Sequence, residues 1–190
     1  VIASLAKDKN MIETFKNGED IHSATAAAIN GVELKDVTKK MRSAAKGVNF
    51  GVLYGMGAHG LAVRIGVTRE QAQEFIDKYF EKYFSIREYL DRTIEFAQEE
   101  GYVETLFGRR RYVPELHSGN FQSRNAGERM AINMPIQGTA ADIMKLAMIG
   151  VYKKLKKHEN KEIRENTNII LQVHDELVVE TLKGTEEEVA

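Results

Sequence analysis

Apolar side chains recur every three or four residues through much of the first hundred positions, a spacing that predicts amphipathic helices. The longest such stripe predicts one helix over residues 69–100, or two joined near Ser85, and comprises Phe75, Tyr79, Tyr83, Ile86, Leu90, Ile94 and Ala97. Residues 1–30 are also predicted to be helical and to end at Asn30-Gly31, a C-cap sequence. Thr38 is predicted to cap a helix that runs to about Tyr54 and is closed by Gly55 and Gly57.

The pattern changes after residue 101. β-Forming residues flank a Gly-Arg turn over 102–113, which predicts a hairpin, and helical spacing returns over 123–157 with a kink expected at Met134-Pro135. Residues 164–168 are predicted to be a loop. Two β-branched runs over 168–181 predict a second hairpin, so apolar that we expect it inside a sheet. The fold class is therefore predicted to be α+β and predominantly helical.

Composition narrows the class of protein without identifying it. The 190 residues are 43% hydrophobic and 29% charged with two prolines, which excludes collagen-like, low-complexity and wholly disordered chains. The absence of cysteine removes disulfide scaffolds, cysteine nucleophiles and cysteine zinc sites. No apolar run approaches the roughly 20 residues of a membrane helix, and no signal peptide begins the chain. We therefore expect a soluble, cytoplasmic protein with no membrane partner.

The net charge of −1 argues against a nucleic-acid partner, but the distribution of charge argues for one. Residues 35–69 hold seven basic groups and one acidic group, a balance of +6. Residues 70–100 hold nine acidic and four basic groups, a balance of −5. The neutrality is the sum of two opposed patches, and the positive patch is a candidate phosphate-binding surface.

Arg42, Lys46, Phe50 and Tyr54 follow one another at steps of four. On a helix each step drifts by only about 40°, so the four form one ridge of two cations and two aromatic rings. Cations near a helix N-terminus oppose the helix dipole, so they gain no electrostatic stabilisation there unless an anion is present. A polyphosphate would supply that anion. The alternative is a solvated basic turn followed by core aromatics. Gly47 and Gly51 disfavour it, because each costs about 1 kcal/mol in a helix and suggests close approach to the backbone.

Two further clusters carry candidate chemistry. Asp175 and Glu176 follow His174 at the tip of the second hairpin, where adjacent carboxylates suit a divalent cation, although a solvent-exposed turn is the alternative. Arg129, Asn133 and Gln137 stand at steps of four, and an arginine with two amides suits the minor groove of DNA. Taken alone, that second set equally fits an ordinary polar helix face.

Residues 55–60 match G-x-G-x-x-G, the fingerprint of dinucleotide-binding folds. That motif requires a preceding strand and a following helix in a βαβ unit, whereas here it follows a predicted helix. We therefore reject a Rossmann fold. His59, His117 and His158 show no metal-ligand spacing and receive no role.

Several segments together resemble one family. RSAAKGVNFGVLYG (42–55) is similar to the fingers-helix signature R-x3-K-x3-F-x3-Y-G of family A DNA polymerases, the bacterial DNA polymerase I group. QVHDELVVE (172–180) resembles its palm motif, and GERMAINMPIQGTAADI (127–143) resembles its conserved-block helix. TLFGRRRYVPEL (105–116) and DIHSATA (20–26) match as well, in the right order, so the resemblance covers essentially the whole chain.

The resemblance implies template-directed DNA synthesis in replication or repair, with dNTPs and primer-template DNA as partners. It implies that His22, Arg42 and Lys46 hold the triphosphate, Lys46 as possible proton donor, with Phe50 beside the sugar and Tyr54 beside the template base. It assigns the primer-template minor groove to Arg129, Asn133, Gln137 and His174, and the DNA backbone to Arg109, Arg110 and Arg111. It implies that Asp175, assisted by Glu176, binds Mg²⁺ in a two-metal site.

The resemblance also implies a fold truncated at both ends: residues 1–30 as a palm-to-fingers segment, 31–101 as fingers and 102–190 as partial palm. The family's other metal-binding aspartate lies in D-Y-S-x-I-E-L-R, and residues 1–15 resemble the segment immediately C-terminal to that motif. Asp8 and Asp142 match other, non-catalytic positions. We therefore expect the isolated chain to be inactive without the upstream segment that carries the thumb and first palm motif. The alternatives are a non-catalytic nucleic-acid or nucleotide-binding fragment and a helical scaffold without a ligand.

Overall fold

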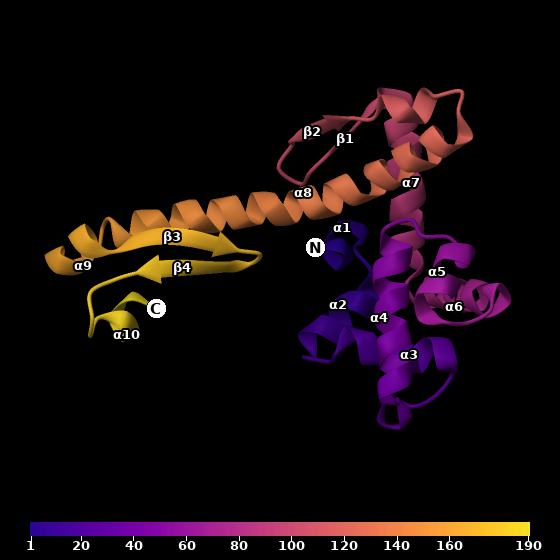
Figure 1. The fold of residues 1–190 in the computed structure, drawn as a ribbon, viewed down its shortest axis with the longest axis horizontal. Helices are drawn as coiled ribbons and strands as arrows, with labels where there is room; N and C mark the ends of the chain where they lie inside the picture. Colours follow the sequence, from indigo (N-terminus) through magenta and orange to yellow (C-terminus); the bar gives the residue numbers. More distant parts are fainter. The chain divides into compact units, whose positions relative to one another are not determined.

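A computed structural model describes all of residues 1–190 (Figure 1). Helices dominate, and each of two antiparallel hairpins forms a two-stranded sheet, which confirms the predicted α+β class. The chain divides into two compact units, Val1–Thr139 and Ala140–Ala190, with the boundary inside helix α8 (Phe121–Leu155). The three predicted segments, 1–30, 31–101 and 102–190, stay predictions.

The first thirty residues are helical, as predicted, and form three helices. They are α1 (Ile2–Ala6), α2 (Lys9–Lys16) and α3 (Ile21–Asn30). Lys7 ends α1 in a left-handed conformation, with φ at 52°. The carboxylates of Asp8 and Asp20 then begin α2 and α3 by accepting hydrogen bonds from the backbone N–H groups of Met11 and Ser23. Gly31 closes α3 with φ at 66°, as the sequence predicts.

The basic patch forms a short 3₁₀ turn and two packed helices. They are η1 (Leu34–Asp36), α4 (Lys39–Leu53) and α5 (Ala58–Ile65). The Thr38 hydroxyl caps α4, which confirms that prediction, and Gly55 with φ at 72° follows the helix. Gly57 is the N-cap residue of α5 rather than part of the end of α4. No strand adjoins the G-x-G-x-x-G segment, so the rejection of a Rossmann fold is confirmed.

The long apolar stripe forms two helices, α6 (Arg69–Lys82) and α7 (Phe84–Glu100). Thr68 and Gln71 start α6 with a reciprocal capping box. Tyr83 separates the two helices, with φ at −117° and ψ at 58°. The sequence places this junction near Ser85, within two residues of its position.

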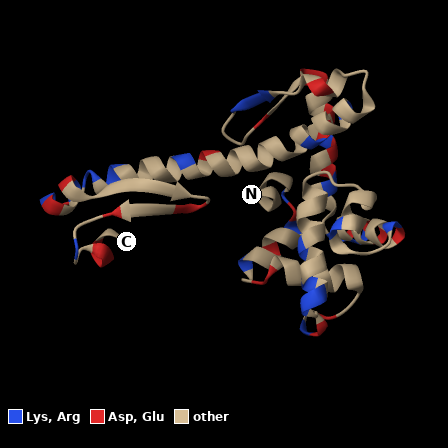
Figure 2. Ribbon diagram, in the orientation of Figure 1, with Lys and Arg blue, Asp and Glu red and all other residues tan.

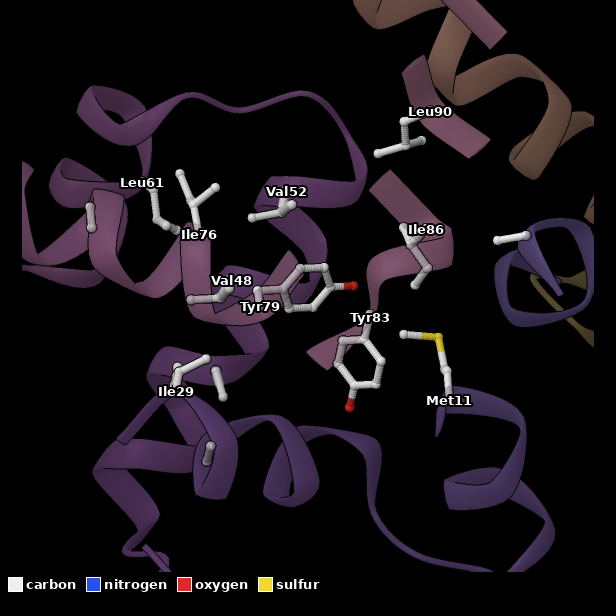
Figure 3. Packing of buried hydrophobic residues seen from close by; sticks show 14 of the residues in the cluster. Met11, Ile29, Val48, Val52, Leu61, Ile76, Tyr79, Tyr83, Ile86 and Leu90 are labelled. Atoms are coloured by element: carbon white, nitrogen blue, oxygen red, sulfur yellow. The ribbon is translucent and has the colours of Figure 1, made fainter. Parts of the chain in front are cut away.

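The main core of the first unit is built from the inward faces of α1 to α7. Tyr79 and Tyr83 are fully buried, and their ring centroids lie 5.0 Å apart (Figure 3). Around them pack other large buried side chains, namely Met11, Ile29, Val48, Leu61, Ile76, Ile86 and Leu90. This packing holds the back of α4 in place, so the opposite face of that helix is displayed on a rigid support.

The first hairpin packs beside the middle of α8. Strands β1 (Tyr102–Glu104) and β2 (Arg110–Tyr112) pair antiparallel with Val103 opposite Arg111, and η2 (Pro114–His117) follows. Helix α8 (Phe121–Leu155) then continues through Pro135. The backbone N–H of Leu106 donates to Thr139 Oγ1 (3.0 Å), which fastens the hairpin loop to α8. A small second core comprises Ala97, Val103, Val113, Leu116, Ala131 and Met134.

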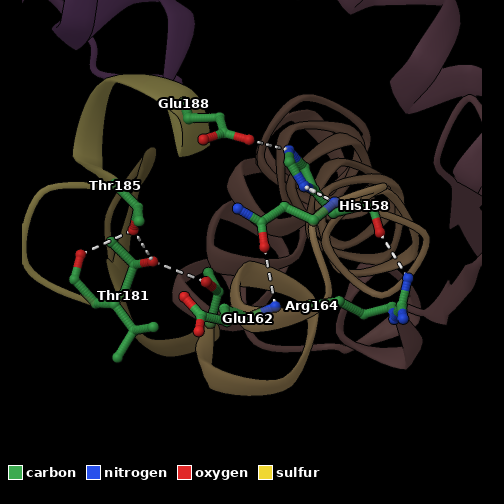
Figure 4. Close-up of polar contacts among 9 residues, drawn as sticks. His158, Glu162, Arg164, Thr181, Thr185 and Glu188 are labelled. Carbon is green, nitrogen blue, oxygen red and sulfur yellow. Dashed lines mark hydrogen bonds and ion pairs between the residues drawn. The ribbon is translucent and has the colours of Figure 1, made fainter.

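The second unit holds the end of α8, α9 (Lys161–Asn166), β3 (Asn168–Val173), β4 (Glu176–Glu180) and α10 (Glu186–Val189). The predicted loop at 164–168 is wrong, because α9 extends to Asn166 and β3 begins at Asn168. Asn160 caps α9, and Ile163 is the buried residue of this helix. Hydroxyl hydrogen bonds of 2.8 Å join Thr181 to both Thr167 and Thr185 (Figure 4). These bonds tie the ends of β3 and β4 to the flanking helices.

The second hairpin forms as predicted, with Val173 opposite Glu176. Its expected burial inside a sheet is wrong in this structure: Ile170, Leu171, Val173 and Val178 are exposed. The reason is that β3 and β4 pair only with each other. No helix of the chain has the length and apolar character needed to cross a bilayer.

Candidate functional site

The predicted ridge lies along α4, with Tyr54 as the residue that ends the helix. Lys and Arg residues lie along this helix (Figure 2). The rings of Phe50 and Tyr54 are stacked, with centroids 6.4 Å apart. His22 of α3 adds a third ring, 5.8 Å from that of Phe50. The structure therefore brings together five predicted site residues on α3 and α4, namely His22, Arg42, Lys46, Phe50 and Tyr54.

Arg42 has a partner that the sequence reasoning missed. Its Nε donates to Asp20 Oδ2 (2.7 Å) and its Nη2 donates to Asp20 Oδ1 (3.1 Å). Hydrogen bonds from Arg42 and Ser23 hold the pKa of the Asp20 carboxyl well below its usual range. Arg42 therefore already has an anionic partner within the chain. The sequence offered no local signal for this pair, because Asp20 and Arg42 lie 22 positions apart on different elements.

His22 is half-buried, and its Nδ1 lies 3.1 Å from the side-chain Nδ2 of Asn49. Burial lowers the pKa of the His22 imidazole, and the nearby Arg42 and Lys46 lower it further, while Asp20 acts in the opposite direction. The imidazole is therefore neutral at neutral pH and can accept at one ring nitrogen and donate at the other.

A cavity of about 570 Å³ opens on the side of α4 that faces α5 and α6. Lys46 and Phe50 of the ridge line it, together with Lys40, Arg64 and Phe75. Gly47 lies at its wall, and a Cβ built there would stand 2.5 Å from Ile65 Cγ2. The close approach expected at the helix glycines is therefore made by α5 of the same chain.

The three arginines of the first hairpin are exposed and differ in their contacts. Arg109 donates from Nη2 to the carbonyl oxygen of Gly138 (3.0 Å). Arg110 pairs with Glu104 and lies over the Tyr102 ring, 4.4 Å from its centroid. Arg111 donates to the sulfur of Met130 (3.0 Å). The hairpin thus presents cations that are held by packing as well as by charge.

Arg129, Asn133 and Gln137 all lie on α8 within the first unit, at the predicted helical spacing. Arg129 and Gln137 are exposed, whereas the Asn133 Oδ1 atom is buried without a hydrogen-bond partner in the chain. The Arg129 side chain also reaches the turn after α4, where its Cγ would lie 3.0 Å from a Cβ built on Gly55. The set is a polar helix face next to the end of the ridge.

His174, Asp175 and Glu176 lie in the second unit and are exposed. His174 and Asp175 form the turn, His174 with a left-handed φ of 53°, and Glu176 begins β4. Backbone strain of about 1–3 kcal/mol at a non-glycine residue is typical of functional turns. No group of three or more His, Cys, Asp or Glu side chains in the chain is arranged to hold a metal. Two exposed carboxylates nonetheless fit Mg²⁺, which takes one or two protein carboxylates beside water and substrate phosphates.

Comparison with known proteins places the chain in a family. The sequence profile of DNA polymerase family A matches residues 1–190. DNA polymerase I of Caldicellulosiruptor bescii is 53% identical over 180 residues, covering 95% of this chain and 21% of that protein. The thermostable DNA polymerase I of Thermus aquaticus is 48% identical over 190 residues, covering 100% and 22%. The chain thus spans about a fifth of the length of these curated relatives.

A solved structure agrees with the sequence comparison. The polymerase domain of Pol1 from M. smegmatis, in complex with DNA primer-template and dNTP, is 41% identical to this chain. Its superposition gives a TM-score of 0.90 and covers 99% of this chain and 32% of that one. The chain belongs to DNA polymerase family A.

Proposed function

We propose that this chain serves template-directed DNA synthesis, in which the deoxynucleotidyl group of a dNTP is transferred to a primer 3′-hydroxyl during replication or repair. The observation that carries the proposal is the ridge of two cations and two rings on α4, with His22 beside it, in a chain of family A. The M. smegmatis structure was solved with DNA primer-template and dNTP, which supports the same partners here.

The ridge supplies what phosphoryl transfer requires, because this reaction depends mainly on positioning and charge stabilisation. His22, Arg42 and Lys46 would hold the triphosphate, and Arg42 would exchange its contact with Asp20 for a phosphate. Lys46 is exposed and would stabilise the leaving pyrophosphate and donate a proton to it. Phe50 would pack against the sugar, and Tyr54 would lie beside the template base.

The remaining cations and amides suit the nucleic acid. Arg129, Asn133 and Gln137 would contact the minor groove of the primer-template, together with His174. The arginines of the first hairpin, Arg109, Arg110 and Arg111, would contact its backbone and add to salt-dependent affinity. In this arrangement residues 1–30 connect palm to fingers, 31–101 form the fingers and 102–190 form part of the palm.

Asp175, with help from Glu176, would hold Mg²⁺. The bound ions would activate the primer 3′-hydroxyl and neutralise charge on the phosphates. Because no third acidic or histidine side chain gathers with this pair, we propose that a further carboxylate ligand comes from the D-Y-S-x-I-E-L-R segment of the family. On this basis residues 1–190 alone would bind nucleotide and DNA but not catalyse synthesis.

Primer extension with Mg²⁺ tests the proposal. The 190-residue chain is assayed alone and after addition of a separate polypeptide that carries the thumb and first palm motif. We expect extension only in the second case, and a fall in kcat of about 100-fold or more in Lys46→Ala, the size expected for a lost proton donor. Extension by the chain alone would contradict the missing-ligand argument. DNA binding without extension in either case would instead favour a non-catalytic nucleic-acid-binding module.

A further inference from the structure

A row of buried polar side chains runs behind the ridge and ends at His22. Tyr83, between α6 and α7, is fully buried, and its hydroxyl lies 3.3 Å from Thr25 Oγ1 in α3. The Thr25 hydroxyl donates to Asn49 Oδ1 (3.2 Å), and Asn49 Nδ2 lies 3.1 Å from His22 Nδ1. Thr25 and Asn49 are both buried. Four side chains from three parts of the chain thus form one continuous hydrogen-bonded row.

The row has a defined direction. An amide side chain offers one acceptor oxygen and one donor nitrogen. Because Asn49 Oδ1 accepts from Thr25, the donor Nδ2 faces His22, and a ring nitrogen that accepts a hydrogen bond carries no proton. The proton of the neutral imidazole therefore lies on Nε2. Thr25 has already donated its only hydroxyl proton, so Tyr83 is the donor at the far end.

We propose that Asn49 is a positioning residue that fixes His22 in the Nε2–H tautomer, so that the imidazole presents an N–H donor to an oxygen of the bound triphosphate. This inference rests on the proposed function, which places the triphosphate at His22. The opposite tautomer would turn a lone pair toward an anionic oxygen and would repel it. Preorganised donors stabilise charge more effectively than groups that must reorient on binding.

The tautomer matters because His22 is neutral at neutral pH. Burial lowers the pKa of its imidazole, as do the charges of Arg42 and Lys46, against the opposing effect of Asp20. Lys82 of α6 also approaches α3, but its Nζ is bound to the carbonyl oxygen of Ala24. A fully protonated His22 would donate from both nitrogens and would lose its hydrogen bond from Asn49, so the row favours the neutral form.

The first measurement needs no nucleotide. Long-range ¹H–¹⁵N spectra of the 190-residue chain with ¹⁵N-labelled histidine report the tautomer, and His22→Gln assigns its signals among the five histidines. We expect Nε2 protonated and Nδ1 unprotonated in the unmodified chain. In Asn49→Asp, whose carboxylate can only accept a hydrogen bond, we expect the neutral imidazole to carry its proton on Nδ1. A proton on Nδ1 in the unmodified chain overturns the proposal.

The second measurement uses dATP binding by equilibrium dialysis, without metal. Loss of a hydrogen bond to a charged group corresponds to roughly a tenfold or greater weakening, which we expect in Asn49→Asp. The same substitution in a His22→Ala background should have only the smaller effect of the added negative charge, because Asn49 acts through His22. An additional loss of similar size in that background would refute the positioning role.

Tyr83→Phe is the matched control. It removes a buried hydrogen bond at the far end of the row and should lower stability, but it leaves the hydrogen bonds of Asn49 in place. We therefore expect an unchanged His22 tautomer and unchanged dATP affinity. If Asn49→Asp inverts the tautomer but leaves dATP affinity unchanged, the placement of the triphosphate at His22 fails, whereas the tautomer assignment stands.

Discussion

Gly47→Ala tests how α5 supports the ridge of α4. The added Cβ would lie 2.5 Å from Ile65 Cγ2, whereas carbon atoms in contact are about 3.5–4.0 Å apart. Overpacking of this kind costs about 1–3 kcal/mol. Alanine regains about 1 kcal/mol of helix propensity, so the net change in the free energy of unfolding lies between no change and a loss of about 2 kcal/mol.

Gly150→Ala isolates the steric cost. Gly150 lies within α8, and a Cβ there would meet nothing within 4 Å, so this substitution should gain the full helix propensity. We expect Gly47→Ala to be less stable than Gly150→Ala by about 1–3 kcal/mol, since the propensity gain is common to both. Urea unfolding followed by far-ultraviolet circular dichroism measures the difference.

Ile65→Leu provides a rescue, because leucine lacks the Cγ2 methyl group while keeping the side-chain volume. Combined with Gly47→Ala, it should recover most of the lost stability, and the two substitutions should be non-additive. Equal stabilisation by Gly47→Ala and Gly150→Ala would refute the reasoning. So would strict additivity of the two substitutions at 47 and 65.

Three further predictions concern the site itself. Asp20→Asn keeps a capping side chain but releases Arg42, so we expect triphosphate affinity to rise by a few-fold in equilibrium dialysis; weaker binding would show that Asp20 orients Arg42 productively. The lowered pKa of Asp20 means that its ion pair with Arg42 stabilises the fold above the ordinary carboxyl pKa of 3.8, and that this contribution is lost as the pH falls through the lowered pKa. Asp20→Asn should therefore be less stable than the unmodified chain above pH 3.8, and the difference should shrink at lower pH. Urea unfolding at several pH values measures it. Phe50→Tyr in the complete polymerase should increase incorporation of dideoxynucleotides, because the added hydroxyl replaces a contact of the missing 3′-hydroxyl; equal incorporation by both forms in primer extension contradicts this.

The local structure was largely predictable from capping and turn residues, whose effect is confined to the backbone within a few positions. Thr38 caps α4, and Gly31 closes α3. Gly108 turns the first hairpin with φ at 79°. Capping and turn formation depend on side chains within a few positions, so these predictions hold to within one or two residues.

Other features could not be read in this way. Residues 161–166 form a short helix whose Ile163 is fully buried, and the spacing of apolar residues along this segment did not predict it. The apolar runs of β3 and β4 predicted a buried sheet, but burial depends on which strands pair with them. The ion pair of Asp20 could not be predicted, because its partner Arg42 lies 22 positions away in the sequence.

The sequence by itself determined the helical periodicity, the caps, the hairpin turns and the ridge on α4, because each of these depends on residues that lie close together along the chain. It also carried the motifs of family A. Only the tertiary structure decided which side chains meet across elements: Asp20 with Arg42, Ile65 with Gly47, and the buried row from Tyr83 to His22. Such contacts depend on how the packing of helix and strand faces brings distant segments together. The spacing of residues within one segment holds no information about which other segment will pack against it.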